Sequence, residues 1–136
     1  MRISISKFYM GLAFLCMVPT TGFTEERSYL CAINEVYECV AVTGCSRISL
    51  EDANLTGIML LDLEKKQLSI APLGQDPSTE DIEGVTVTDE AILLHGIGKK
   101  GRTWSAAISP KTGSLSAGVS TLDSSLALLG ICTAKP

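Results

Sequence analysis

The cysteines are the residues of this chain with the clearest chemistry, and they divide into one and four. Cys16 lies in an apolar stretch near the N-terminus, whereas Cys31, Cys39, Cys45 and Cys132 lie beyond it. The gaps between these four are 7, 5 and 86 residues, unlike the close cysteine pairs of structural zinc sites. Four cysteines behind a secretory signal are typical of two disulfides in an oxidising compartment.

Four cysteines allow three pairings. We favour Cys39–Cys45, which would close a short loop containing Gly44, together with Cys31–Cys132, which would tie the first strand of the domain to the last. The connectivity stays open on the sequence alone.

His95 is the only histidine, so a Ser-His-Asp arrangement would have to use it. Serines and acids such as Ser105, Asp89 and Asp123 are plentiful, but no G-x-S-x-G nucleophile elbow is present. Period-two alternation places His95 with Leu93 on the outer face of its strand. We therefore expect no catalytic residue, and a hydrolase using His95 is the less favoured alternative.

An acidic cluster offers oxygen atoms of the kind that calcium prefers. Its members are Asp76, Glu80, Asp81 and Glu83. Their spacing does not match an EF-hand loop, and such a run is more often a solvated loop. We expect no metal site and no cofactor.

A basic, glycine-containing segment superficially suggests a phosphate cradle. It contains Gly96, Gly98, Lys99, Lys100, Gly101 and Arg102. Neither common glycine-rich phosphate motif is satisfied, and a basic hairpin turn explains these residues better. Lys99, Lys100 and Arg102 are nevertheless the candidate contact for an acidic partner.

The N-terminus has the three parts of a signal peptide. Arg2 and Lys7 form a basic region, residues 8–18 are apolar, and residues 19–24 are small and polar apart from Phe23. The 11-residue apolar run is shorter than the ~20 residues of a membrane-spanning helix. We predict a signal peptide over residues 1–24, cleaved between Gly22 and Glu25, and a single disulfide-bonded domain over residues 25–136.

Removal of residues 1–24 leaves 112 residues with a net charge of −6 and three aromatic residues, Tyr29, Tyr37 and Trp104. Nucleic-acid binding needs basic surface and stacking rings, so this composition argues against it. Anionic membrane surfaces are disfavoured for the same electrostatic reason. Met59 is the only methionine left after cleavage, and His95 is the only histidine. This excludes a copper site rich in methionine or histidine.

Alternation with period two, interrupted by turn residues, predicts an all-β domain. The expected strands are residues 28–34, 57–63, 67–71, 82–88, 91–97, 103–109, 114–120 and 126–132. We expect residues 72–83 to be a loop, and the capping-box pattern of Ser49 and Asp52 predicts one helical turn. Asn54 begins a glycosylation sequon, meaningful only in a host with that machinery.

The inner and outer faces predicted for these strands suit an antiparallel meander that forms a small barrel or curved sheet. One side of the later hairpin carries alternating large and small apolar residues, namely Trp104, Ala106, Ile108, Leu115, Ala117 and Val119. Leu126, Leu128 and Cys132 share a face of the last strand.

The chain resembles a group of small, uncharacterised periplasmic proteins of proteobacteria. The resemblance rests on the cluster of Cys31, Cys39 and Cys45, on residues 51–55, on Trp104-Ser105 with Thr112-Gly113, and on residues 130–132. The resemblance implies the periplasmic compartment and the fold of that group, and it implies no particular activity.

The sequence therefore favours a periplasmic or secreted, monomeric, non-enzymatic binding or inhibitor module. Its partner would be a protein or a small ligand, a hypothesis that rests on fold analogy. The alternative is an accessory structural protein of a cell-envelope assembly, which would carry an exposed apolar patch.

Overall fold

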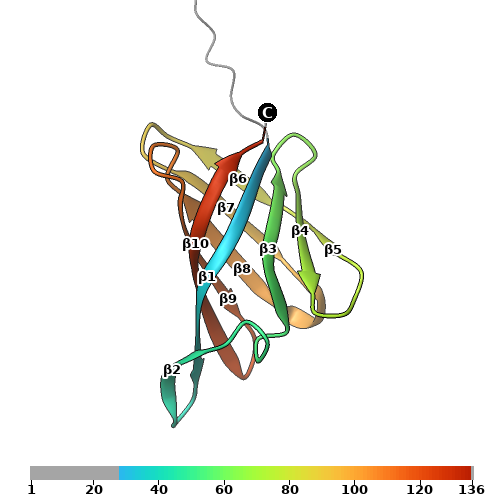
Figure 1. The fold of residues 1–136 in the computed structure, drawn as a ribbon, viewed down its shortest axis with the longest axis vertical. Coiled ribbons are helices and arrows are strands. Elements are labelled where there is room, and N and C mark those ends of the chain that lie inside the picture. Colours follow the sequence, from blue (N-terminus) through green and yellow to red (C-terminus); the bar gives the residue numbers. More distant parts are fainter. Residues whose placement is uncertain (1–27, 136) are drawn as a thin grey trace, which may run out of the picture.

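A computed structural model describes residues 28–135 as one curled antiparallel sheet (Figure 1). The strands are β1 (Ser28–Val40), β2 (Gly44–Ile48), β3 (Leu55–Asp62), β4 (Gln67–Pro72), β5 (Ser78–Asp81), β6 (Gly84–Val87), β7 (Ile92–Ile97), β8 (Thr103–Ile108), β9 (Ser114–Ser120) and β10 (Ser124–Ala134). A 3-10 turn, η1 (Lys99–Gly101), connects β7 to β8. The predicted all-β class is confirmed.

The strand order is β5-β4-β3-β1-β10-β9-β8-β7-β6, with β2 added beside β1. The first and last strands of the domain therefore pair at the centre of the sheet, from Tyr29 opposite Ala134 to Val40 opposite Ser124. On either side the chain runs as a meander of hairpins, and the sheet curls into a half-barrel. Short turns between antiparallel strands produce this arrangement.

The central strand β1 changes its neighbour halfway along. Its first part, residues 28–32, pairs with β3, and its second part, residues 36–40, pairs with β2. The register against β10 shifts between Ile33 and Glu35, as at a β-bulge, which bends a strand. The β1–β2 hairpin consequently projects beyond the half-barrel, at the bottom of Figure 1.

The two strands at the ends of the sheet order, β5 and β6, are consecutive in the chain. Ile82 and Glu83 join them: the N–H of Ile82 donates to the carbonyl of Lys66 at 2.8 Å, and that of Glu83 donates to the carbonyl of His95 at 2.9 Å. Because Ile82 is also buried, the junction connects the β4 side of the half-barrel to the β7 side.

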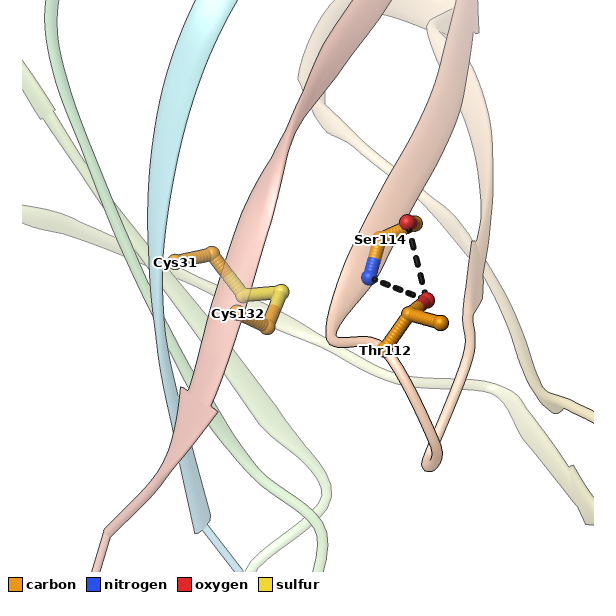
Figure 2. The surroundings of a disulfide bond; sticks show 4 residues. All are labelled: Cys31, Thr112, Ser114 and Cys132. Carbon is orange, nitrogen blue, oxygen red and sulfur yellow. Dashed lines mark hydrogen bonds between the residues drawn. A yellow bond between two sulfur atoms is a disulfide. The ribbon is translucent and has the colours of Figure 1, made fainter.

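Both favoured disulfides are present. Cys31–Cys132 links β1 to β10 across 101 residues, and Cys39–Cys45 links β1 to β2 across 6 residues. Figure 2 shows the first beside the β8–β9 turn, where the N–H of Ser114 donates to Thr112 Oγ1 at 3.3 Å. The same turn reaches β10 directly, because the N–H of Cys132 donates to the carbonyl of Gly113 at 2.6 Å.

The turns gather at two ends of the half-barrel. Residues 63–66, 88–91 and 109–113 lie at the upper end in Figure 1, and residues 41–43, 49–54, 73–77, 98–102 and 121–123 lie at the lower end. The larger core cluster includes Tyr29, Leu61, Leu94, Ile108 and the Cys31–Cys132 disulfide. A smaller cluster around Ile33, Val36 and Leu128 lies toward the lower end.

The predicted faces of the strands are correct. Trp104, Ala106, Ile108 and Leu115 are buried, Ala117 and Val119 are half-buried, and Leu128 and Cys132 share the inner face of β10. Ser49 begins a hydrogen-bonded turn, in which the N–H of Asp52 donates to Ser49 Oγ at 3.0 Å. The predicted signal peptide, with Cys16, lies outside the described residues.

Two expectations for polar segments are wrong. Residues 72–83 are not entirely a loop, because Ser78–Asp81 form β5 and pair with β4. The first strand does not end at Asn34: it continues to Val40, because its second half pairs with β10 and with the unexpected strand β2.

Candidate ligand-binding cavity

The inner faces of the half-barrel enclose an apolar cavity of about 250 Å³. Leu55, Met59 and Leu61 on β3 line one side, and Ala106 on β8 and Ala117 on β9 line the other. The space arises because small alanines occupy inward positions where large side chains would otherwise meet across the sheet. Protein pockets for drug-sized ligands usually span about 300–1,000 Å³, so this cavity fits a smaller molecule.

One ion pair lies in the wall of this apolar space. Arg102 Nη2, just before β8, contacts Glu80 Oε1 on β5. The Glu80 side chain is only 10% exposed, whereas that of Arg102 is 40% exposed. A nearly buried carboxylate is tolerated because the guanidinium compensates its charge.

The ion pair packs against Gly98. A Cβ atom at Gly98 would come within 2.7 Å of Arg102 Nε and 3.1 Å of Glu80 Oε1, so any larger residue at position 98 would displace the pair. The β7–β8 turn also holds its shape through the N–H of Gly98, which donates to the carbonyl of Arg102 at 2.7 Å. The turn therefore fixes the backbone position from which the Arg102 side chain reaches Glu80.

Trp104 forms another part of the wall. The residue is 7% exposed, and its Nε1 atom has no hydrogen-bond partner among the described residues. Its ring lies against Gly96, where a Cβ atom would come within 2.7 Å of Trp104 Cε2 and of the Asp81 carbonyl. A buried donor without an acceptor is rare and unfavourable in proteins, so this indole has an unused capacity to donate.

The cavity extends to the lower end of the half-barrel. Its lining includes Asn54, Pro72, Arg102 and Thr121, which belong to or adjoin four separate turns at that end. Toward the other end the wall is closed by Leu61 and Leu68 of the larger core cluster. A ligand would therefore enter between the lower turns.

The three candidate partner-binding residues lie in the turn as expected, but in two environments. Lys99 and Lys100 are exposed on η1. Arg102 is half-buried and pairs with Glu80, so it belongs to the cavity wall. The structure thus separates two exposed lysines from an arginine that is paired with Glu80.

The acidic cluster does not converge on one point. Asp76, Asp81 and Glu83 are exposed, whereas Glu80 turns inward to Arg102. Within residues 28–135 no group of three or more histidine, cysteine or acidic residues could hold a metal ion.

His95 occupies the outer face of β7, as its sequence position predicted. It pairs across the strands with Ser105 and lies over Gly84. The imidazole makes no hydrogen bond or ion pair with any residue that the structure describes. A shallow surface hollow beside it is lined by small side chains, among them Ser105, Ala107 and Ser116.

Sequence reasoning did not join Glu80 to Arg102. Each lay in a separate charged cluster, 22 positions apart, and each cluster has a solvated explanation of its own. Ser78–Asp81 are all polar, so the sequence carries no apolar alternation that would have marked Glu80 as facing inward.

Comparisons with protein-family models, with curated proteins and with solved structures found no significant match to this chain. The two disulfides indicate an oxidising, extracytoplasmic environment. Between Ser28 and Lys135 there is no helix whose length and apolar character would let it cross a bilayer.

Proposed function

We propose that this protein is a periplasmic or secreted, non-enzymatic binding module that holds a small amphiphilic molecule in its half-barrel. The apolar cavity with its single Glu80–Arg102 pair carries the proposal. Concave, mostly apolar sites with a few polar groups are the usual form of small-molecule sites.

The charge of the wall favours a ligand with an uncharged head group. Glu80 and Arg102 already compensate each other, so a charged head would bring an unpaired charge into apolar surroundings, which is unfavourable. A hydroxyl group can donate to the carboxylate and accept from the guanidinium or from Trp104 Nε1. A short-chain alcohol such as octanol is therefore a suitable probe, and octanoate is its charged counterpart.

Trp104 supplies the measurement, because it is the only tryptophan in the chain and lies in the cavity wall. We expect octanol to change the tryptophan fluorescence saturably, and octanoate to bind at least about tenfold more weakly at neutral pH. An unchanged spectrum with both probes, or non-saturable changes only, would contradict the proposal.

A matched pair of variants tests whether the cavity is the site. Ala117→Leu adds a large side chain inside the cavity, and Ala127→Leu adds the same atoms to the outer face of the neighbouring strand. We expect only Ala117→Leu to abolish octanol binding. Its circular dichroism and unfolding midpoint should be measured alongside, so that loss of fold is not mistaken for loss of binding.

The alternative of an accessory protein in an envelope assembly is favoured by a separate observation. The outer face of β3, β1 and β10 carries exposed apolar residues at neighbouring register positions: Leu30, Ile58, Leu129 and Ile131. Contiguous apolar surface of this kind marks association sites. Sedimentation of the wild type and of Ile58→Ser with Ile131→Ser tests self-association through this face. An assembly lost in the variant supports the alternative, and a wild-type monomer at all concentrations excludes self-assembly.

A further inference from the structure

The lower end of the half-barrel presents exposed aliphatic side chains on four different turns or strand ends. They are Val42 in the β1–β2 turn, Leu73 after β4, Ile97 at the end of β7 and Leu122 in the β9–β10 turn. We call these four residues the apolar rim. Val42 is fully exposed, Leu122 is 91% exposed and Ile97 is 64% exposed.

The position of the rim relates it to the cavity. Leu73 follows Pro72 and Leu122 follows Thr121, and both preceding residues line the cavity. Ile97 precedes Gly98, on which the Glu80–Arg102 pair is seated. Three members of the rim thus lie beside turns that line the cavity, and Val42 lies on the β1–β2 hairpin that projects beyond the same end (Figure 1).

The backbone conformation of Val42 is unfavourable for a valine. Its φ angle is +74°, in the left-handed region that β-branched residues strongly disfavour. The Cys39–Cys45 disulfide and the strand pairing hold the hairpin in this conformation. Strained backbone positions of this kind cluster at functional sites.

We infer that the apolar rim docks on an uncharged lipid surface, with the open end of the cavity facing the lipid. Isolated aliphatic side chains at separate turn tips suit a fluid apolar phase, which accepts them at any spacing. Protein-binding hot spots instead favour tryptophan, tyrosine and arginine in a packed centre, and the rim has none of these.

The charges at this end select the kind of lipid. Lys99 and Lys100 are exposed there, but so are the acidic residues Glu51, Asp52, Asp76 and Asp123. The acidic excess gives no attraction to an anionic surface. We therefore expect zwitterionic phosphatidylcholine to be sufficient and anionic phosphatidylglycerol to add nothing.

Vesicle co-sedimentation with two double variants tests the inference. Val42→Ser with Leu122→Ser removes two members of the rim, and Val87→Ser with Leu93→Ser makes the same changes at exposed positions near the upper end. We expect phosphatidylcholine vesicles to bind the wild type and the Val87/Leu93 variant equally. The Val42/Leu122 variant should bind at least about tenfold more weakly.

Equal binding by the two variants would overturn the inference, as would a requirement for phosphatidylglycerol. A wild-type protein that stays in the supernatant would also overturn it and would favour a protein partner for the rim. This inference stands apart from the proposed function: loss of octanol binding in Ala117→Leu with vesicle binding retained would concern the cavity alone.

Discussion

The two ends of the half-barrel differ in the aliphatic residues of their turns and in what lies beneath those turns. At the upper end the turns carry charged and polar residues, such as Glu64, Lys65, Asp89 and Lys111, and the larger core cluster and the long disulfide lie just below them. At the lower end the turns carry exposed aliphatic residues beside charged ones, and beneath them the cavity lies next to the smaller core cluster.

If the proposed function is correct, one sheet combines a stabilising end with a binding end. Fully buried Leu61 and Ile108 belong to the larger cluster, where close packing gives most of the stability. The small inward residues beside the cavity and the projecting hairpin of the lower end are instead less closely packed. A binding surface drawn from the less stable part of a domain is the general pattern.

The largest expected effect separates the two disulfides. Cys31→Ser with Cys132→Ser should lower the free energy of unfolding by about 4.7 kcal/mol, and Cys39→Ser with Cys45→Ser by about 2 kcal/mol, because the long loop loses more closure entropy. Urea unfolding of both variants measures the difference. Equal losses would mean that the two ends contribute equally to stability.

Trp104 tests where the core ends and the cavity begins. Trp104→Ala should destabilise the protein by about 3–5 kcal/mol if the indole packs as a core side chain. Trp104→Phe keeps most of the packing and removes the unpaired Nε1 donor, so its loss should be much smaller. A negligible effect of Trp104→Ala on the thermal midpoint would assign the ring to the cavity wall alone.

Removal of one member of the ion pair should have an intermediate effect. Arg102→Met leaves the nearly buried Glu80 carboxylate without its partner and should lower stability by about 1–3 kcal/mol. The double variant Glu80→Gln with Arg102→Met should recover part of that loss. A double-mutant cycle by chemical denaturation gives the coupling, and a coupling of zero would show that the pair is a screened surface contact.

The features that could be predicted from sequence are those that depend on near neighbours. Trp104, Ala106 and Ile108 alternate over five residues and are followed by Pro110, so their hairpin and its inner face were predictable. β5 was not, because Ser78–Asp81 are polar and owe their strand conformation to pairing with β4. The cavity depends on curvature and on which small residues face each other, and no local pattern records either.

The strained turn should respond in the opposite direction from the other sites. Val42→Asn places a residue that tolerates positive φ at this position and should raise stability by up to about 1 kcal/mol. Differential scanning calorimetry measures the change. A loss of stability would show that Val42 contributes packing that its full exposure hides.

The smallest expected effect is a loss of stability at alkaline pH through Tyr37 in the lower half. The phenol of Tyr37 donates to Glu35 Oε2 at 2.7 Å, and this hydrogen bond and the negative charge of Glu35 raise the pKa of Tyr37 above its ordinary value of 10.0. The contribution is complete below pH 10.0 and is lost as pH rises through the raised pKa. In Glu35→Gln, absorbance titration should show Tyr37 ionising at lower pH; an unchanged titration would refute the assigned cause.

The pairing of β1 with β10 also determines when the domain can form. Its central ladder joins residues about as far apart in the chain as the domain permits, from Tyr29 opposite Ala134. A growing chain can form the hairpins of either half, but both halves keep an unpaired edge until the last strand has been synthesised. Folding is therefore completed only when β10 is available to pair with β1, and pairings between such distant residues form slowly.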